Sequence, residues 1–289
     1  MRNLKRALSL ALASVMVMGL MVVGTGASYV DVSSEQNQEA IEVLQAVGVM
    51  TGDENGNFNP DTNVTRNEMA VVMSNLMDYR VANYKGTSPF TDVPSWAEPY
   101  VAACYTNGII AGYDAKTFGG SDSVTAAQAA LMMMKALGYF QYQSDFGADW
   151  QLSTVAQGNK IDLFDDVDSG VKEAMTRNDV AQLVLNALEA GTVEAEKNGQ
   201  DINVGDISIT SGVTYKYVTS GKDYAKAIND NQSTSANSIN GVTAPIVELG
   251  EKLYQGDLTK ASEEDDFGRP ATKWEYQAKE IGTFADKAD

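Results

Sequence analysis

One short phrase occurs three times in this chain, and it constrains the fold more than any other feature. VTRNEM begins at Val64, VTAAQA at Val124 and MTRNDV at Met175. The glycine-containing stretch before the first copy, residues 47–65, aligns with residues 107–125. Repetition at this period predicts one supersecondary unit used three times, each unable to bury its apolar face alone.

Each unit is predicted to fold as helix, loop and helix. Apolar residues recur at helical spacing before and after a loop made of turn-forming residues. In the first unit Gly48 follows the last residue of the first helical stripe, where a glycine commonly ends a helix. The third copy is weaker, because NKIDLFDDVDSGVKEA stands in place of its glycine-rich loop.

The repeated phrase contains the signal of a helix start. Thr65 is followed by Glu68 at the spacing of a capping box, in which each side chain accepts a hydrogen bond from the other residue's backbone amide. Each such cap stabilises a helix by about 1 kcal/mol. The other two copies have the same form, with Asp a weaker partner than Gln or Glu: Thr125 with Gln128, and Thr176 with Asp179.

Two arginines in the phrase are not explained by capping. Arg66 and Arg177 follow the cap residue directly, so each cation faces the positive end of a helix dipole. A compensating partner is expected, and two are open: a carboxylate of the protein, or an anionic ligand held together with the exposed amides of the helix start. The middle copy has Ala126 at this position.

The composition excludes several classes of function. The chain has no histidine, which removes Ser-His-Asp, Cys-His and His-metal chemistry. Its single cysteine, Cys104, lies in an apolar run and is predicted to be a buried small side chain. The formal net charge is −18. So acidic a chain is not expected to bind nucleic acid or anionic lipid, since phosphate binding needs a dense basic face.

The N-terminus resembles a secretory signal peptide. MRNLKR supplies positive charge, an apolar run from Ala7 to Val23 follows, and GTGAS supplies small residues. We expect cleavage after Ala27, with a retained membrane helix as the alternative. No cysteine stands there for a lipid anchor, and no other segment is apolar enough to span a bilayer. The mature protein is therefore expected to be secreted and to lie outside the membrane.

Three motifs together resemble the S-layer homology (SLH) domain family: FTDVPSWAEPYV, NGIIAGYDAKTF and VTRNE. The resemblance covers about Tyr29 to Ala190. It implies a mostly α fold, with three helix-loop-helix repeats in a pseudo-threefold, three-pronged bundle. It also implies non-covalent binding of an anionic, pyruvylated secondary cell-wall polysaccharide, which would place the protein in the cell wall or S-layer of a bacterium. Other S-layer subunits are further expected partners.

The same resemblance suggests which residues bind the polysaccharide. The family's arginine corresponds to Arg66 and Arg177, so Ala126 implies that the middle site is weak or silent. Family members also line their grooves with the loop and the start of the first helix. In this chain the corresponding residues are Asp31, Asp92, Trp96, Gly112 and Tyr113, although core packing is the simpler explanation for Trp96.

These observations predict five segments. They are a signal peptide at 1–27, SLH repeats at 28–84, 85–143 and 144–192, and a linker with a β-containing segment at 193–289. The last segment includes the alternating stretches ISITSGVTYKYV and KWEYQAKEIGTF and a candidate short helix in IVELGEKLYQ. The repeats would anchor a surface protein whose displayed part is not readable from this chain.

Calcium binding is the nearest alternative for the loops. In DENGNFNPDTNV, Asp53, Asn55 and Asn57 stand as in an EF-hand, but the sixth position is Phe58 and the twelfth is Val64. A secreted, self-assembling calcium-binding protein therefore remains an alternative. A second, unspecific calcium candidate is the acidic cluster Asp165, Asp166 and Asp168.

Catalysis is the other alternative class. Acidic pairs such as those at Glu263 to Asp266 are typical of a solvated surface. We therefore predict no enzyme, no cofactor and no metal site within these residues. The alternative is that the chain is the anchoring end of a wall-active enzyme whose catalytic part lies outside it.

Overall fold

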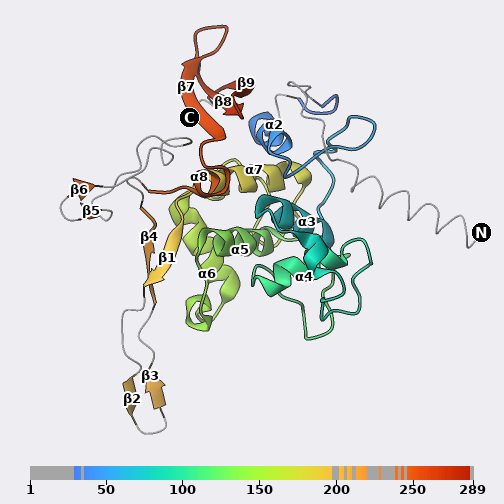
Figure 1. Ribbon diagram of the computed structural model, residues 1–289, viewed down its shortest axis with the longest axis vertical. Helices are drawn as coiled ribbons and strands as arrows, with labels where there is room; N and C mark the ends of the chain where they lie inside the picture. The colour runs from blue at the N-terminus through green and yellow to red at the C-terminus, as the bar shows by residue number, and fades with distance from the viewer. Residues whose placement is uncertain are drawn as a thin grey trace, which may run out of the picture.

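The computed structural model describes residues 29–33, 36–196, 202–204, 207–209, 213–219, 228, 238–239, 242–243 and 246–286. The predicted signal peptide lies outside these residues. The described chain is a group of helices followed by small antiparallel sheets, as predicted for the two parts (Figure 1). None of the helices in these ranges has both the length and the apolar character needed to cross a bilayer.

The helical part follows the order of the repeats. The first predicted repeat contains α2 (Gln38–Ala46), α3 (Arg66–Leu76) and the 3-10 helix η1 (Val81–Tyr84). The second contains α4 (Glu98–Thr106) and α5 (Ala126–Leu137), and η2 (Gln143–Phe146) begins at its last residue and continues into the third. The third contains α6 (Trp150–Gly158), η3 (Asn159–Ile161) and α7 (Arg177–Glu189).

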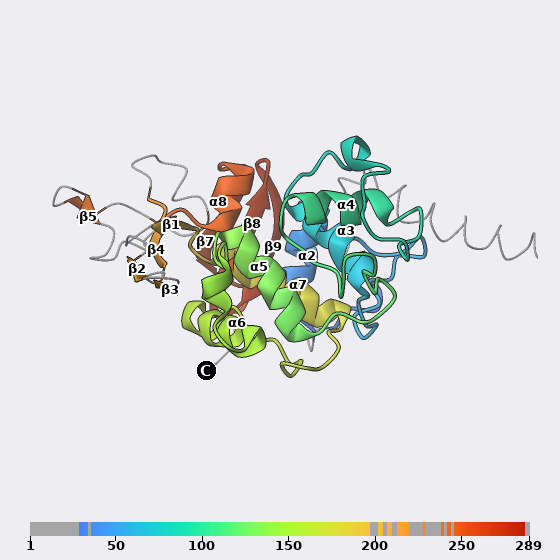
Figure 2. The ribbon, with the colours of Figure 1, turned by 90° about the horizontal axis from the view of Figure 1, so that it is seen from below.

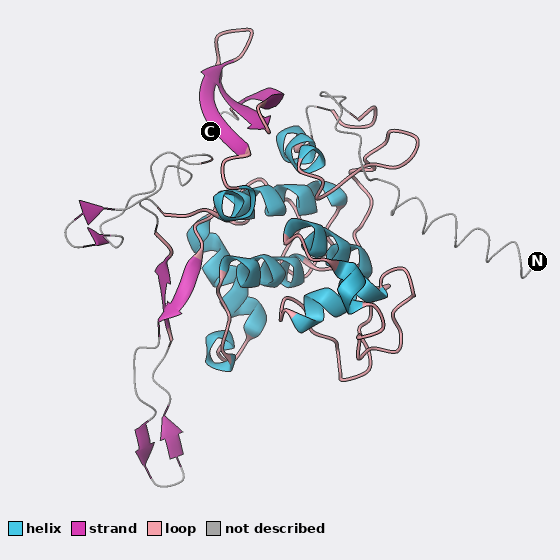
Figure 3. Cartoon of the chain, in the orientation of Figure 1, coloured by secondary structure: helices cyan, strands magenta, loops and turns pink. Residues whose placement is uncertain are grey.

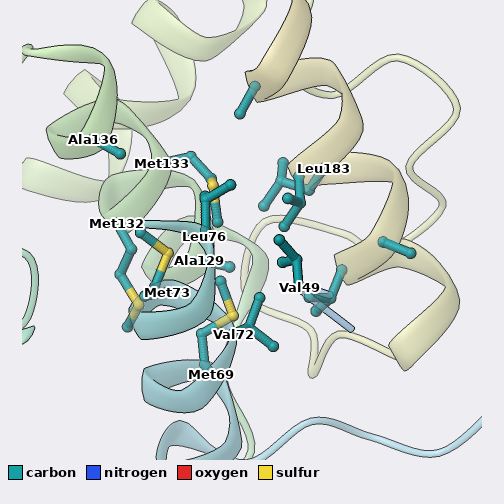
Figure 4. Packing of buried hydrophobic residues seen from close by; sticks show 14 of the residues in the cluster. Val49, Met69, Val72, Met73, Leu76, Ala129, Met132, Met133, Ala136 and Leu183 are labelled. Atoms are coloured by element: carbon teal, nitrogen blue, oxygen red, sulfur yellow. The ribbon is translucent and has the colours of Figure 1, made fainter. Parts of the chain in front are cut away.

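The repeats bury their apolar faces against one another. Figure 4 shows methionines of α3 and α5 meeting Leu183 of α7 in one cluster. Met73 and Met133 are fully buried in it. The methionines therefore fill the core between repeats, as their flexible and polarisable side chains allow.

Backbone hydrogen bonds join the three copies of the repeated phrase in a closed ring. The amide of Val64 donates to the carbonyl of Met175 at 2.9 Å, and Met175 donates to Val124 at 2.9 Å. Val124 donates back to Val64 at 2.8 Å. Each copy is therefore paired with both of the others directly before its helix begins.

The C-terminal part contains short antiparallel pairs and one larger sheet (Figure 3). The short strands are β1 (Val193–Glu196) with β4 (Thr214–Tyr217), β2 (Ile202–Val204) with β3 (Ile207–Ile209), and β5 (Ser238–Ile239) with β6 (Val242–Thr243). The larger sheet is a meander of β7 (Leu258–Glu264), β8 (Pro270–Tyr276) and β9 (Lys279–Ala285). The predicted short helix is α8 (Leu249–Tyr254).

The meander lies against the helices, with β9 beside α2 (Figure 2). Trp274 of β8 is fully buried, and its Nε1 donates to Glu39 of α2 at 2.6 Å. Lys260 of β7 pairs with Glu189 at the end of α7. The C-terminal sheet is thus tied to the first and the last helix of the repeat region.

Candidate functional site

Arg66 reaches from the first repeat into the loop of the second. Its Nε donates to the carbonyl of Phe118 at 3.1 Å, and its Nη2 donates to Ala111 at 2.8 Å. The guanidinium lies over the Phe118 ring at 4.6 Å and over the Tyr113 ring at 4.8 Å. Arg66 is only 4% exposed, and this burial lowers its pKa, an effect that Tyr113 and Asp122 partly offset.

Arg177 repeats this arrangement between the third repeat and the first. Its Nε donates to the carbonyl of Phe58 at 2.7 Å and its Nη2 to Thr51 at 2.8 Å, with the Phe58 ring 4.5 Å away. Arg177 is partly exposed, and burial again lowers its pKa, against the opposing effect of Glu68. Each arginine therefore joins two repeats through carbonyl oxygens and a ring.

Within the chain, the hydrogen-bond partners of the two arginine side chains are not the carboxylates that the sequence offered as one possibility. They are main-chain carbonyls from distant parts of the chain. Phe118 lies 52 residues from Arg66, and Phe58 lies 119 residues from Arg177. Two of five guanidinium N–H groups are used in each case, which leaves donors for a further acceptor.

The helix-start amides are already bonded, so the suggestion that they hold an anion is wrong. In α3, Arg66 and Asn67 donate their backbone amides to the carbonyls of Asp122 and Gly120, each at 2.9 Å. The third amide, of Glu68, donates to Thr65 Oγ1 at 3.2 Å. In α7 the first two amides donate in the same way to carbonyls of the first repeat.

The cap residues occupy the positions expected of them. Thr65 with Glu68 and Thr125 with Gln128 form reciprocal capping boxes. Thr176 accepts from the Asp179 amide without the reciprocal bond. Asp179 Oδ2 instead accepts from the amide and hydroxyl of Ser169, so its side chain holds the loop of its own repeat.

Asp31 and Asp92 each hold a loop that an arginine contacts. The Asp92 carboxylate accepts from the amides of Phe118 and Gly119, both at 2.8 Å. Burial raises the pKa of Asp92. The hydrogen bonds from these two amides lower it by more, so the pKa lies below its usual value. Asp31 accepts in the same way from the amides of Phe58 and Asn59, at 2.8 and 2.6 Å.

Gly112 allows a ring to pack directly on the loop backbone. A Cβ at this position would lie 2.3 Å from the Phe90 ring and 2.6 Å from the Thr117 carbonyl oxygen. Trp96 is half-buried and packs against the hydrophobic core. These two positions, named as groove walls from the family resemblance, have a packing role in the structure.

Tyr113 is a predicted site residue whose side chain is open to solvent. It is 56% exposed, although the arginine beneath its ring is almost fully buried. Its hydroxyl donates to Asp122 Oδ2 at 3.0 Å, and the ring leaves no room for a Cβ at Gly119, which would lie 2.2 Å away. Tyr113 thus covers Arg66. Asp53 stands at the matching place in the first repeat, beside Arg177.

The middle copy differs on both sides of the contact. Ala126 is fully buried, and its amide donates to the Glu173 carbonyl of the third repeat. In the other two contacts the loop phenylalanine lies four residues before the carbonyl that accepts from the helix-start amide. The residue four positions before Glu173 is Ser169. The third repeat offers no ring there, and the middle copy supplies no arginine.

Sequence reasoning missed the loop phenylalanines as parts of the arginine sites. The signal was available, since Phe58 and Phe118 align and the third repeat lacks an equivalent. In the described part of the chain, no group of three or more acidic or cysteine side chains is placed to hold a metal ion.

Comparison with known proteins finds similarity over part of the chain. A model of the S-layer homology domain matches residues 28–70 and 89–130. The chain is 27% identical over 169 residues to the middle cell wall protein of Brevibacillus brevis, covering 57% of this chain and 16% of that protein. It is 24% identical over 240 residues to the surface layer protein of Brevibacillus choshinensis, covering 81% and 21%.

A third relative carries an enzyme name. The chain is 26% identical over 176 residues to exoglucanase XynX of Acetivibrio thermocellus, covering 55% of this chain and 16% of that protein. This chain thus spans less than a quarter of each of these three relatives. The two stretches that match the S-layer homology domain, residues 28–70 and 89–130, between them contain Arg66 and the loop that it holds.

Proposed function

We propose that this chain anchors a secreted surface protein non-covalently to the bacterial cell wall, by binding an anionic, pyruvylated secondary cell-wall polysaccharide. The observation that carries the proposal is the pair of inter-repeat arginines, each with guanidinium N–H groups beyond the two that bind carbonyls. A pyruvate ketal carries a compact carboxylate, for which a guanidinium is a suitable donor. The domain matches and the printed names of the relatives support a cell-surface role.

The occurrence of the same stretch in proteins of different kinds supports attachment over catalysis. The matched relatives include a cell wall protein, a surface layer protein and an exoglucanase, and each match covers a minor share of the relative. A module shared in this way is expected to hold its carrier in place. Residues 193–289 would then connect the anchor to the displayed part or to neighbouring surface-layer subunits.

We further propose that the predicted repeats form a three-pronged bundle with pseudo-threefold symmetry, and that the ring of Val64, Val124 and Met175 is its centre. Two of its three inter-repeat contacts contain an arginine, so two glycan sites are expected. Two linked sites of modest affinity gain avidity because the second binding step is intramolecular. The net charge of −18 opposes an anionic polymer at long range, so binding depends on the local potential at each arginine.

The two sites are not equivalent. Arg177 is partly exposed, whereas Arg66 is 4% exposed beneath Tyr113. A glycan carboxylate is therefore expected to engage Arg177 first, and to reach Arg66 only when the Tyr113 ring moves aside. The remaining predicted residues, Asp31, Asp92, Trp96 and Gly112, would support the sites by holding the loops and the core.

The test is co-sedimentation of the secreted chain with wall sacculi that carry their polysaccharide. Binding should persist with calcium chelated, fall when the polysaccharide or its pyruvate is removed, and fall in Arg66→Ala with Arg177→Ala. Arg80→Ala is the matched control, because Arg80 is exposed and lies outside both contacts. Unchanged binding to sacculi stripped of polysaccharide would sink the proposal, and loss of binding on chelation alone would favour the calcium alternative.

A further inference from the structure

Two glutamates are fully buried at the start of α8. Glu248 and Glu251 are both 0% exposed. The backbone amide of Glu248 donates to Glu251 Oε2 at 3.0 Å. Both carboxyl oxygens of Glu248, and Oε1 of Glu251, lack a hydrogen-bond donor in the described structure. Buried carboxylate oxygens without donors are costly, so this arrangement needs a physical explanation.

Among the residues that the structure describes, no lysine or arginine forms an ion pair with Glu248 or Glu251. The cations on neighbouring elements are engaged or exposed: Lys260 of β7 pairs with Glu189 of α7, and Lys216 of β4 with Glu196 of β1. Lys252, on α8 itself, is exposed. Glu189 adds negative charge near Glu248. The remaining titratable groups on the adjoining strands are Glu194, Tyr215, Tyr217, Glu263 and Glu264.

A shared proton would give a partner to two of these three oxygens and leave the third on an uncharged carboxyl group. Burial raises the pKa of Glu248 far above its usual range, and the neighbouring carboxylate of Glu251 raises it further. A protonated Glu248 has an O–H group that can donate to the Glu251 carboxylate. Two acidic groups this close in an apolar site cannot both ionise without a large cost.

The pair lies where the repeat region joins the C-terminal meander, with α8 between α7 and β7 (Figure 1). The Leu249 amide donates to the carbonyl of Ala190 at 3.0 Å, and Thr192 donates to Val247 at 2.9 Å. Gly250 sits so close to its neighbours that a Cβ would lie 2.2 Å from Ile228 Cδ1. Opening this junction would expose the glutamates to water.

We propose that Glu248 and Glu251 share one proton and act as a pH-sensitive latch, which holds α8 and the following meander on the repeat region and weakens as pH rises. The proton is bound in the closed junction and released when the junction opens. By linkage, the opening equilibrium constant then rises tenfold for each pH unit above the ordinary carboxyl pKa, until the closed pair itself loses its proton. The latch is independent of glycan binding at the arginines.

The test is urea unfolding of the whole chain at pH 6.0, 7.0 and 8.0, followed by tryptophan fluorescence and circular dichroism. In the unfolding transition that exposes the pair, Glu248→Gln should abolish the tenfold rise of the equilibrium constant per pH unit. The glutamine amide can donate to Glu251 without a proton that titrates. Glu251→Gln should have the same effect. Glu39→Gln is a control, since Glu39 is a half-buried glutamate that also contacts the meander, and burial raises its own pKa. Glu54→Gln is an exposed control. Both controls should leave the dependence that Glu248→Gln removes.

The proposal is overturned if Glu248→Gln and the native chain show the same pH dependence. A carbon-13 titration of the glutamate carboxyls in the native chain keeps the test decisive if the variant does not fold. One carboxyl should remain protonated at pH 8, and its signal should be absent in Glu251→Gln or Glu248→Gln. Ionisation of every glutamate below pH 6.5 would rule out the latch.

Discussion

Arg177 Nε donates a hydrogen bond of 2.7 Å to the carbonyl oxygen of Phe58, which lies 119 residues earlier in the chain. This bond joins the last helix of the repeat region to the first loop. The same contact, between Arg66 and Phe118, joins the start of α3 to the loop of the second repeat. An arginine proposed for ligand binding thus also holds the loop that would form one side of its site.

Replacing Arg177 is therefore expected to change stability as well as binding. Arg177→Ala removes two charge-assisted hydrogen bonds to carbonyls and should cost about 2–4 kcal/mol in urea unfolding. Arg177→Lys keeps the charge but lacks the planar fork that reaches both carbonyls, so it should lose a large part of the same stability. Arg80→Ala should be neutral. Equal stability of Arg177→Ala and Arg80→Ala would show that the carbonyl bonds do not stabilise the fold.

Restoring the repeated phrase in the middle copy should not create a third site. Ala126 is fully buried and faces a repeat with Ser169 in place of the loop phenylalanine. Ala126→Arg would place a large cation in a fully buried position without the ring of the other contacts, and should cost about 3 kcal/mol or more. Ala126→Ser, a small polar control, should be tolerated far better. Stronger sacculus binding by a stable Ala126→Arg chain would contradict this expectation.

Tyr113 should control access to Arg66. Phenylglyoxal modification, located by mass spectrometry, should be slow at Arg66 and faster at the partly exposed Arg177. Tyr113→Ala removes the covering ring and should speed modification of Arg66 several-fold, with no change at Arg177. Tyr113→Phe keeps the ring but loses the bond to Asp122, so an intermediate rate is expected. The idea fails if Arg66 reacts equally fast in all three chains.

Asp92 should make the second loop sensitive to acid. The amides of Phe118 and Gly119 bind its ionised form and hold its pKa below the usual value, although burial acts in the opposite direction. A carboxyl with a depressed folded pKa adds stability above its unfolded pKa, and this stability is lost as pH falls through the folded pKa. Asp92→Asn should therefore lower the urea midpoint at pH 7 and flatten its decline below about pH 4. Glu54→Gln, at an exposed position, is the control. If the urea midpoint of Asp92→Asn declined with acid as steeply as that of the native chain, the role given to Asp92 would be contradicted.

The local features were predictable because their causes lie close together in the chain. Thr65 and Glu68 are three residues apart, so the capping box follows from spacing alone. The apolar stripe of α2 likewise predicts its buried face, with Ile41 and Leu44 fully buried. The alternation in KWEYQAKEIGTF predicts the strands that become β8 and β9.

The contacts of the site were not predictable, because they depend on which repeats meet. The partner of Arg66 is the main chain at Phe118, and a main-chain carbonyl leaves no trace in residue identity. The exposed fraction of Tyr113 also depends on this meeting of repeats. The buried pair Glu248 and Glu251 looks in the sequence like any other acidic spacing on a helix, and only the packing of α8 makes it unusual.

The ring of backbone hydrogen bonds among Val64, Val124 and Met175 limits how this region can be transferred to another protein as a fusion tag. Removing any one repeat leaves one of the other two amides without an acceptor and one carbonyl without a donor. It also exposes to water the apolar core that the repeats share. A single repeat grafted onto another protein is therefore expected to be poorly folded. The smallest transferable unit is the whole stretch from the start of the first repeat to the end of α7.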